Sequence, residues 1–153
     1  ARNHLHHEQI GTVMDIYSTI VDASKSSSPA KHPVDGVSLI PQLSGKSNKE
    51  RPDHFMCHFP HSHRSSYFTS FRKGDWKLVY RYLTNTGKRK SKDPLPKYEL
   101  YNLKNDPYET KNLALGNTKK TNEMIRFMTK QLETENALLP VRDDRELRPQ
   151  LIK

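Results

Sequence analysis

Residues 67–82 read YFTSFRKGDWKLVYRY, and this stretch decides the fold. The runs on either side of the compact turn Lys73-Gly74-Asp75 are rich in aromatic and β-branched residues, which favours strands over a helix. The stretch therefore predicts a β-hairpin. Side chains alternate between the two faces of a strand. The second strand thus has one face suited to a core, formed by Trp76, Leu78 and Tyr80.

Further elements are predicted on both sides of the hairpin. Alternation around Phe55, Cys57 and Phe59 predicts a preceding strand, and residues 98–103 (YELYNL) predict a following one. Residues 119–136 predict a final helix with one apolar face: Met124, Phe127, Met128 and Leu132. We therefore expect an α+β fold, in which a small antiparallel sheet of about four strands carries a C-terminal helix.

An earlier amphipathic helix is predicted over residues 8–23, where apolar residues recur at helical spacing. A loop with several serines and two prolines, residues 24–33, separates it from the rest of the chain. Leu, Ile, Val and Phe make up 32 of 153 residues, close to the roughly 20% below which a charged chain tends to be disordered. We therefore expect the first helix to pack against a larger body.

The net charge of +9 is concentrated in the middle of the chain. Residues 64–104 hold 11 basic and 3 acidic residues. A local positive field favours an anionic partner, such as nucleic acid, acidic lipid or a sulfated or phosphorylated substrate. A solvated basic loop explains the same pattern, and both interpretations stay open. No apolar run approaches the ~18 residues of a membrane span.

The densest polar cluster is HFPHSHR at residues 58–64. Histidine can bind a metal, transfer protons or donate to anionic oxygens, and arginine adds a bidentate fork for sulfate, phosphate or carboxylate. No cysteine, aspartate or glutamate within the cluster completes a metal site, so a contact with a substrate anion is the stronger functional hypothesis. Loop histidines bonded to the backbone are the structural alternative. The candidate substrate-binding residues are His58, His61, His63 and Arg64.

We assign no catalytic residue and no metal ligand to this chain. It has no G-x-S-x-G nucleophile elbow and no glycine loop that would cradle a phosphate. The one cysteine, Cys57, excludes an internal disulfide, and its neighbours predict a buried structural thiol. Basic strands with interleaved aromatic residues also suit nucleic acid, but no RNP, KH or helix-turn-helix pattern supports that function.

Five segments resemble type I sulfatases, in the same order and spacing over about residues 8–137. They are residues 12–23 (TVMDIYSTIVDA), 33–45 (PVDGVSLIPQLSG), 58–63 (HFPHSH), 70–80 (SFRKGDWKLVY) and 98–114 (YELYNLKNDPYETKNLA). The resemblance covers only the C-terminal part of such an enzyme. It implies that residues 1–45 are the end of an alkaline-phosphatase-like α/β catalytic domain. Residues 46–153 would then be the C-terminal subdomain.

The catalytic centre of that family is not found in this sequence. The family nucleophile is a formylglycine made from Cys or Ser in C/S-x-P-x-R, and neither residues 57–61 (CHFPH) nor 27–31 (SSPAK) satisfy this pattern. Asp53-His54-Phe55 departs from the family's calcium-binding "DHG" turn at its third residue. We therefore expect no cofactor in this chain, with calcium and formylglycine supplied by the upstream domain of the parent enzyme.

The resemblance implies the C-terminal part of a sulfatase, a sulfuric ester hydrolase acting on sulfated carbohydrates in the periplasm or outside the cell. The expected partners are the N-terminal catalytic domain and a sulfated small molecule or glycan, with no nucleic acid and no membrane span. Alone, this chain is expected to be inactive. The alternative is a non-catalytic module that binds sulfated glycans or other polyanions through its basic loops.

Overall fold

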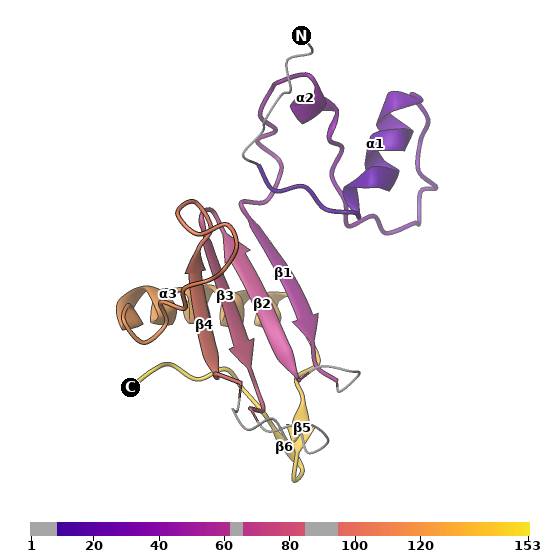
Figure 1. Cartoon of the computed structure of the whole chain (residues 1–153). Coiled ribbons are helices and arrows are strands. Elements are labelled where there is room, and N and C mark those ends of the chain that lie inside the picture. Colours follow the sequence, from indigo (N-terminus) through magenta and orange to yellow (C-terminus); the bar gives the residue numbers. More distant parts are fainter. Residues whose placement is uncertain (1–8, 62–65, 85–94) are drawn as a thin grey trace. The chain divides into compact units, whose positions relative to one another are not determined.

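A computed structural model describes residues 9–61, 66–84 and 95–153 (Figure 1). The chain forms two compact units, residues 1–53 and 54–153. The prediction that residues 1–45 end a larger catalytic domain is not tested by this division and stays a prediction.

The second unit is built on an antiparallel sheet, which confirms the predicted α+β fold. Its strands are β1 (His54–Phe59), β2 (Phe68–Lys73), β3 (Trp76–Arg81) and β4 (Tyr98–Asn102). They lie side by side in the order β1-β2-β3-β4 (Figure 1). At the predicted hairpin, Lys73 pairs with Trp76, so Gly74 and Asp75 form the two-residue turn. Gly74 has φ +55°, a conformation that glycine adopts without a steric penalty.

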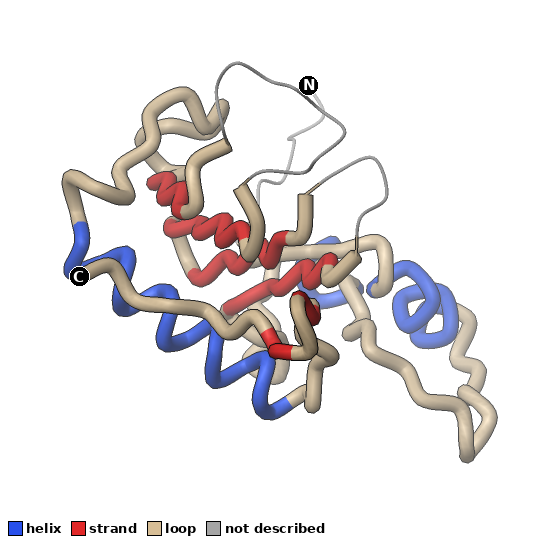
Figure 2. The backbone as a smooth tube through the Cα atoms, turned by 90° about the horizontal axis from the view of Figure 1, so that it is seen from below, coloured by secondary structure: helices blue, strands red, loops and turns tan. Residues whose placement is uncertain are grey.

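Helix α3 (Thr118–Thr134) covers one face of this sheet (Figure 2). The Asn117 side chain caps its first turn by accepting from the Lys120 amide. The core between helix and sheet comprises Phe71, Leu78, Tyr80, Tyr82, Leu100, Ala114, Met124, Ile125, Met128 and Leu132. Of the predicted apolar face, Met124, Met128 and Leu132 are buried, whereas Phe127 is not. Ile125 is buried in its place, and Phe127 lies at the edge of the buried face of α3, 38% exposed.

The residues after α3 return along the unit (Figure 2). They form the small hairpin of β5 (Val141–Arg142) and β6 (Arg145–Glu146). The Asn122 side chain then holds the tail, since it accepts from the Ile152 amide and donates to the Ile152 carbonyl at 2.8 and 3.0 Å. The tail is thus an ordered part of the unit.

The first unit contains α1 (Asp15–Ala23) and the short α2 (Ile40–Leu43). Helix α1 is shorter than the predicted 8–23. The Gln9 side chain bonds the backbone of Asn48, and the Ile10 carbonyl accepts from Arg51, so the preceding residues are held out of the helix. Several apolar side chains of this unit are exposed: Val13, Met14, Ile16, Tyr17, Ile20, Val34 and Leu43.

A buried ion pair organises the first unit. Arg51 lies 2.8 Å from the Asp15 carboxylate, and both side chains are at most 5% exposed. Burial alone would raise the pKa of Asp15. Amide hydrogen bonds from Val37 and Thr12, together with Arg51, outweigh burial and hold that pKa below 3.8. Removing either charged partner would leave the other buried and uncompensated.

No helix in the described part of the chain is long and apolar enough to cross a membrane.

Candidate anion-binding site

Strand β1 carries the histidine segment to one end of the sheet in the second unit. His58 is the penultimate residue of β1, and His61 follows the strand by two residues. His63 and Arg64 lie outside the described residues. The structure therefore places two of the four candidate substrate-binding residues.

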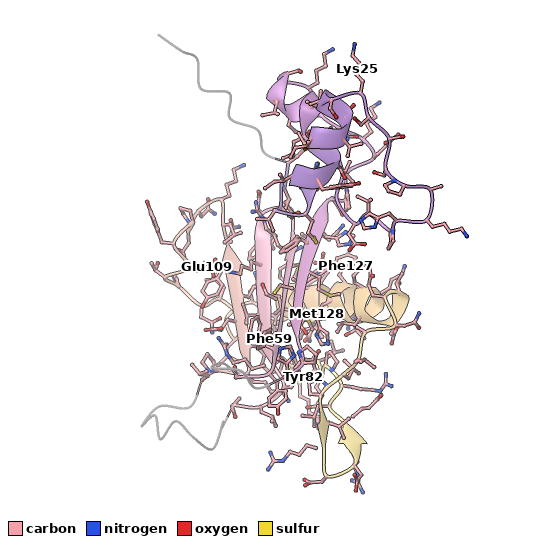
Figure 3. All side chains as sticks on the ribbon, turned by 90° about the vertical axis from the view of Figure 1, so that its right-hand side faces the viewer. Lys25, Phe59, Tyr82, Glu109, Phe127 and Met128 are labelled. Carbon is pink, nitrogen blue, oxygen red and sulfur yellow. The ribbon has the colours of Figure 1, made fainter. Side chains whose placement is uncertain are left out.

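His58 is engaged at both ring nitrogens. Its Nδ1 lies 2.7 Å from the Thr69 hydroxyl, and its Nε2 lies 2.8 Å from the Leu138 carbonyl oxygen. The ring also packs edge-on against Tyr82, with centroids 6.1 Å apart. Figure 3 shows Tyr82 and Phe59 at the end of the sheet near the β5–β6 hairpin. An anion could bind the His58 nitrogens only by displacing one of these bonds.

His61 presents an exposed ring. Its centroid lies 4.0 Å from that of Phe59, and Phe59 in turn stacks on Phe68 at 5.6 Å. Phe59 and Phe68 are paired across β1 and β2, so the cross-strand pair fixes this platform. Within the described residues His61 has no hydrogen-bond or ion-pair partner, so its nitrogens can meet a ligand. A ring of this kind can donate to an anionic oxygen, and more strongly when protonated.

Part of the positive charge in the middle of the chain is neutralised on the sheet. Lys77 pairs with Glu109 at 2.6 Å, and Arg81 pairs with Glu99. Glu99 also accepts from the Tyr101 hydroxyl at 3.2 Å. Burial, followed by the nearby charge of Glu99, raises the pKa of Tyr101 to about 12. The face of β3 and β4 is therefore less cationic than the sequence suggested.

Cys57 is exposed, which corrects the prediction of a buried thiol. It alternates with Met56 and His58, whose side chains contact the core and Thr69, and so it points to the face opposite α3. Across residues 9–61, 66–84 and 95–153, no three His, Cys, Asp or Glu side chains gather as metal ligands.

Sequence reasoning missed two residues that contact His58, namely Thr69 and Tyr82. Their hydroxyls lie 2.9 Å apart, next to His58. The alternation in β3 puts Tyr82 in line with Leu78 and Tyr80, which is the signal that could have found it. Thr69 faces His58 across the pairing of β1 with β2. Only the register between these two strands reveals it.

Comparisons with known proteins agree with this fold. The sequence matches the family described as N-sulphoglucosamine sulphohydrolase, C-terminal, over residues 2–137. A comparison with curated protein sequences gave no match.

Similar solved structures include BT4656 in complex with its substrate D-glucosamine-2-N,6-O-disulfate. It is 22% identical with a TM-score of 0.56, and the match covers 80% of this chain and 24% of that one. BT1596, a 2-O GAG sulfatase, is 21% identical with a TM-score of 0.57, covering 80% and 25%. The phosphonate monoester hydrolase of Agrobacterium radiobacter is 21% identical with a TM-score of 0.54, covering 85% and 26%. At these identities the likeness shows the fold.

The chain spans about a quarter of the length of these structures. The family match, in contrast, covers most of this chain and extends over parts of both compact units. The protein belongs to the N-sulphoglucosamine sulphohydrolase C-terminal family.

Proposed function

We propose that this chain acts as the C-terminal part of a sulfatase and that His61, His63 and Arg64 contact the sulfated substrate. The family match over residues 2–137 carries the proposal. The ring of His61 supports the site, since it is exposed and has no hydrogen-bond or ion-pair partner among the residues that the structure describes. His63 and Arg64 follow directly in the sequence and would add an imidazole and a guanidinium. Sulfate oxygens are well suited to both groups.

The chemistry of ester cleavage would come from the remainder of the enzyme. The sequence holds no C/S-x-P-x-R motif, and no three His, Cys, Asp or Glu side chains gather among the described residues. Calcium and formylglycine are part of this proposal as groups held by the catalytic partner. An extracytoplasmic location is part of the same proposal.

The exposed apolar side chains of the first unit support packing on that catalytic partner. Val13 is 83% exposed, Ile20 62% and Leu43 66%. Burying such side chains is worth about 1.5–3 kcal/mol each. A catalytic domain that covers them would supply the larger body expected for the first helix.

A sulfated sugar is the substrate class that we favour. One similar structure is described with D-glucosamine-2-N,6-O-disulfate as its substrate. The stacked rings of Phe59 and Phe68, with the tilted ring of His61 against Phe59, offer an aromatic surface beside the anion contact. Ligand sites commonly combine apolar rings with a few polar groups in this way.

Titration calorimetry tests this function directly. We expect the chain to bind glucosamine 2-N,6-O-disulfate and to bind unsulfated glucosamine far more weakly. His61→Ala and Arg64→Ala should each weaken binding about tenfold, the effect of one charge-assisted hydrogen bond. His32→Ala is the matched control, since His32 is an exposed histidine of the other unit. Equal binding of the sulfated and unsulfated sugars would refute the proposed site.

A non-catalytic module that holds polyanions is the second candidate. The concentration of basic residues in 64–104 favours it. It predicts heparin retention that falls steeply with salt, because exposed charges are screened. It also predicts that the complete gene product releases no sulfate, which separates it from the sulfatase.

A further inference from the structure

The hydrogen-bond partners of His58 determine where its ring proton lies. The partner of Nε2 is the Leu138 carbonyl oxygen, which can only accept. Nε2 therefore carries the hydrogen. In the neutral imidazole Nδ1 is then an acceptor, so it receives the hydroxyl proton of Thr69 across 2.7 Å.

The same logic continues one residue further. Thr69 is fully buried, and it donates its only hydroxyl hydrogen to His58. It must therefore accept from the Tyr82 hydroxyl, 2.9 Å away. Burial raises the pKa of Tyr82, although the bond with Thr69 opposes this effect, so the hydroxyl keeps its proton. A series of hydrogen bonds, each donating to the next residue, therefore runs from Tyr82 through Thr69 and His58 to the Leu138 carbonyl.

This series of hydrogen bonds joins three separate parts of the second unit. Tyr82 directly follows β3, Thr69 lies in β2, and Leu138 lies in the segment between α3 and β5. His58 is their common anchor, one residue before the end of β1. The ring of His61 then rests on Phe59, the last residue of that strand.

We propose that His58 is a positioning residue of the anion site: its hydrogen bond to the Leu138 carbonyl fixes the end of β1, so that His61 is presented on the Phe59 ring for the sulfate. This inference rests on the proposed function and assigns different roles to two histidines of the same segment. His58 contacts no substrate, and His61 does.

Nuclear magnetic resonance of the full chain tests the positioning step without any ligand. Imidazole nitrogen shifts should show His58 as the Nε2–H tautomer. The ring protons of His61 should be shifted upfield by the Phe59 ring current, and His58→Ala should return them toward values of an unstructured histidine. An Nδ1–H tautomer, or a His61 spectrum unchanged in His58→Ala, would overturn the inference.

Two conservative variants separate positioning from substrate contact. In His58→Gln the side-chain amide nitrogen can still reach the Leu138 carbonyl. The Asn side chain of His58→Asn is one methylene shorter and cannot reach it. We expect His58→Gln to retain the His61 shift and to bind glucosamine 2-N,6-O-disulfate within about twofold of the original chain. His58→Asn should lose the shift and bind about tenfold more weakly, the loss of one hydrogen bond.

The two proposals fail in different ways. If His58→Gln retains the His61 shift and His58→Asn loses it, but neither the original chain nor any variant binds the sugar, the proposed function is wrong and the positioning role stands. If His58→Gln keeps the His61 shift yet binds as poorly as His61→Ala, His58 itself contacts the sugar, and the positioning role is wrong.

Discussion

Replacing Gly36 with alanine should destabilise the first unit, because there is no room for a side chain. A Cβ built on Gly36 would lie 2.1 Å from the Met14 carbonyl oxygen and 2.9 Å from the Asp15 Cα. Both obstacles are main-chain atoms at the start of α1, so no rotamer change relieves the clash. The segment around Gly36 must move away by about 1 Å.

That movement would break two hydrogen bonds between the segment and α1. The Val37 amide donates to the Asp15 carboxylate at 2.9 Å, and the Ser18 hydroxyl donates to the Gly36 carbonyl at 2.7 Å. The first bond has a charged acceptor and is worth about 1.5–3 kcal/mol, and the second is worth about 1 kcal/mol. Gly36→Ala should therefore lower the local free energy of unfolding by about 2–4 kcal/mol.

Hydrogen exchange with mass spectrometry on the full chain measures this loss. Amides in residues 15–23 and 36–39 should exchange roughly 30- to 1,000-fold faster in Gly36→Ala, the equivalent of that free energy. Gly11→Ala is the matched control in the same unit, because its Cβ would meet only the flexible Leu39 side chain, at 3.4 Å. Unchanged exchange in Gly36→Ala, or an equal effect in Gly11→Ala, would refute this reasoning.

Three further predictions concern Asp15, the buried core of the second unit and the β5–β6 turn. The pKa of Asp15 lies below 3.8, so its contribution to stability is present above about pH 4 and is lost as pH falls through the folded-state pKa; hydrogen exchange in α1 between pH 5 and pH 2 measures this. Leu78→Ala should destabilise the second unit by about 2–5 kcal/mol, since Leu78 is fully buried, and urea unfolding followed by Trp76 fluorescence measures the loss. Asp143 and Asp144 both have positive φ in the β5–β6 turn, so replacing them with Asn-Gly should raise stability by about 1 kcal/mol in thermal unfolding.

Much of the second unit could be predicted because its elements are specified locally. The turn at Gly74 fixes the central hairpin, and alternation identifies the strands around it. Phe127 shows the limit of this reasoning. Helical spacing alone places Phe127 beside Met124 and Met128. The position of the helix on the sheet decides which neighbouring side chain is buried, and that side chain is Ile125.

The candidate site was predicted only in part for a similar reason. Histidine and arginine are recognisable in any sequence, so residues 58–64 could be singled out. The difference between His58 and His61 could not be seen, because it depends on Thr69 and Leu138, which are 11 and 80 residues away from His58. Such contacts are set by strand register and by the path of the tail after α3.

The first helix could be located but not delimited. Its apolar spacing begins before Asp15, yet Gln9 and Ile10 bond residues near position 50 and leave the helix. The buried pair of Asp15 with Arg51 has no local signature, since 36 residues separate its members. The exposed apolar side chains of α1 agree with the expectation that the helix packs against a larger body.

The central claim is that this chain contributes to a sulfatase whose bond-breaking groups lie in another part of the enzyme. Free sulfate released from glucosamine 2-N,6-O-disulfate tests it most directly, measured for this chain alone and for the complete product of its gene. We predict release by the complete product and none by this chain. Comparable release by this chain alone, or no release by the complete product, would contradict the account.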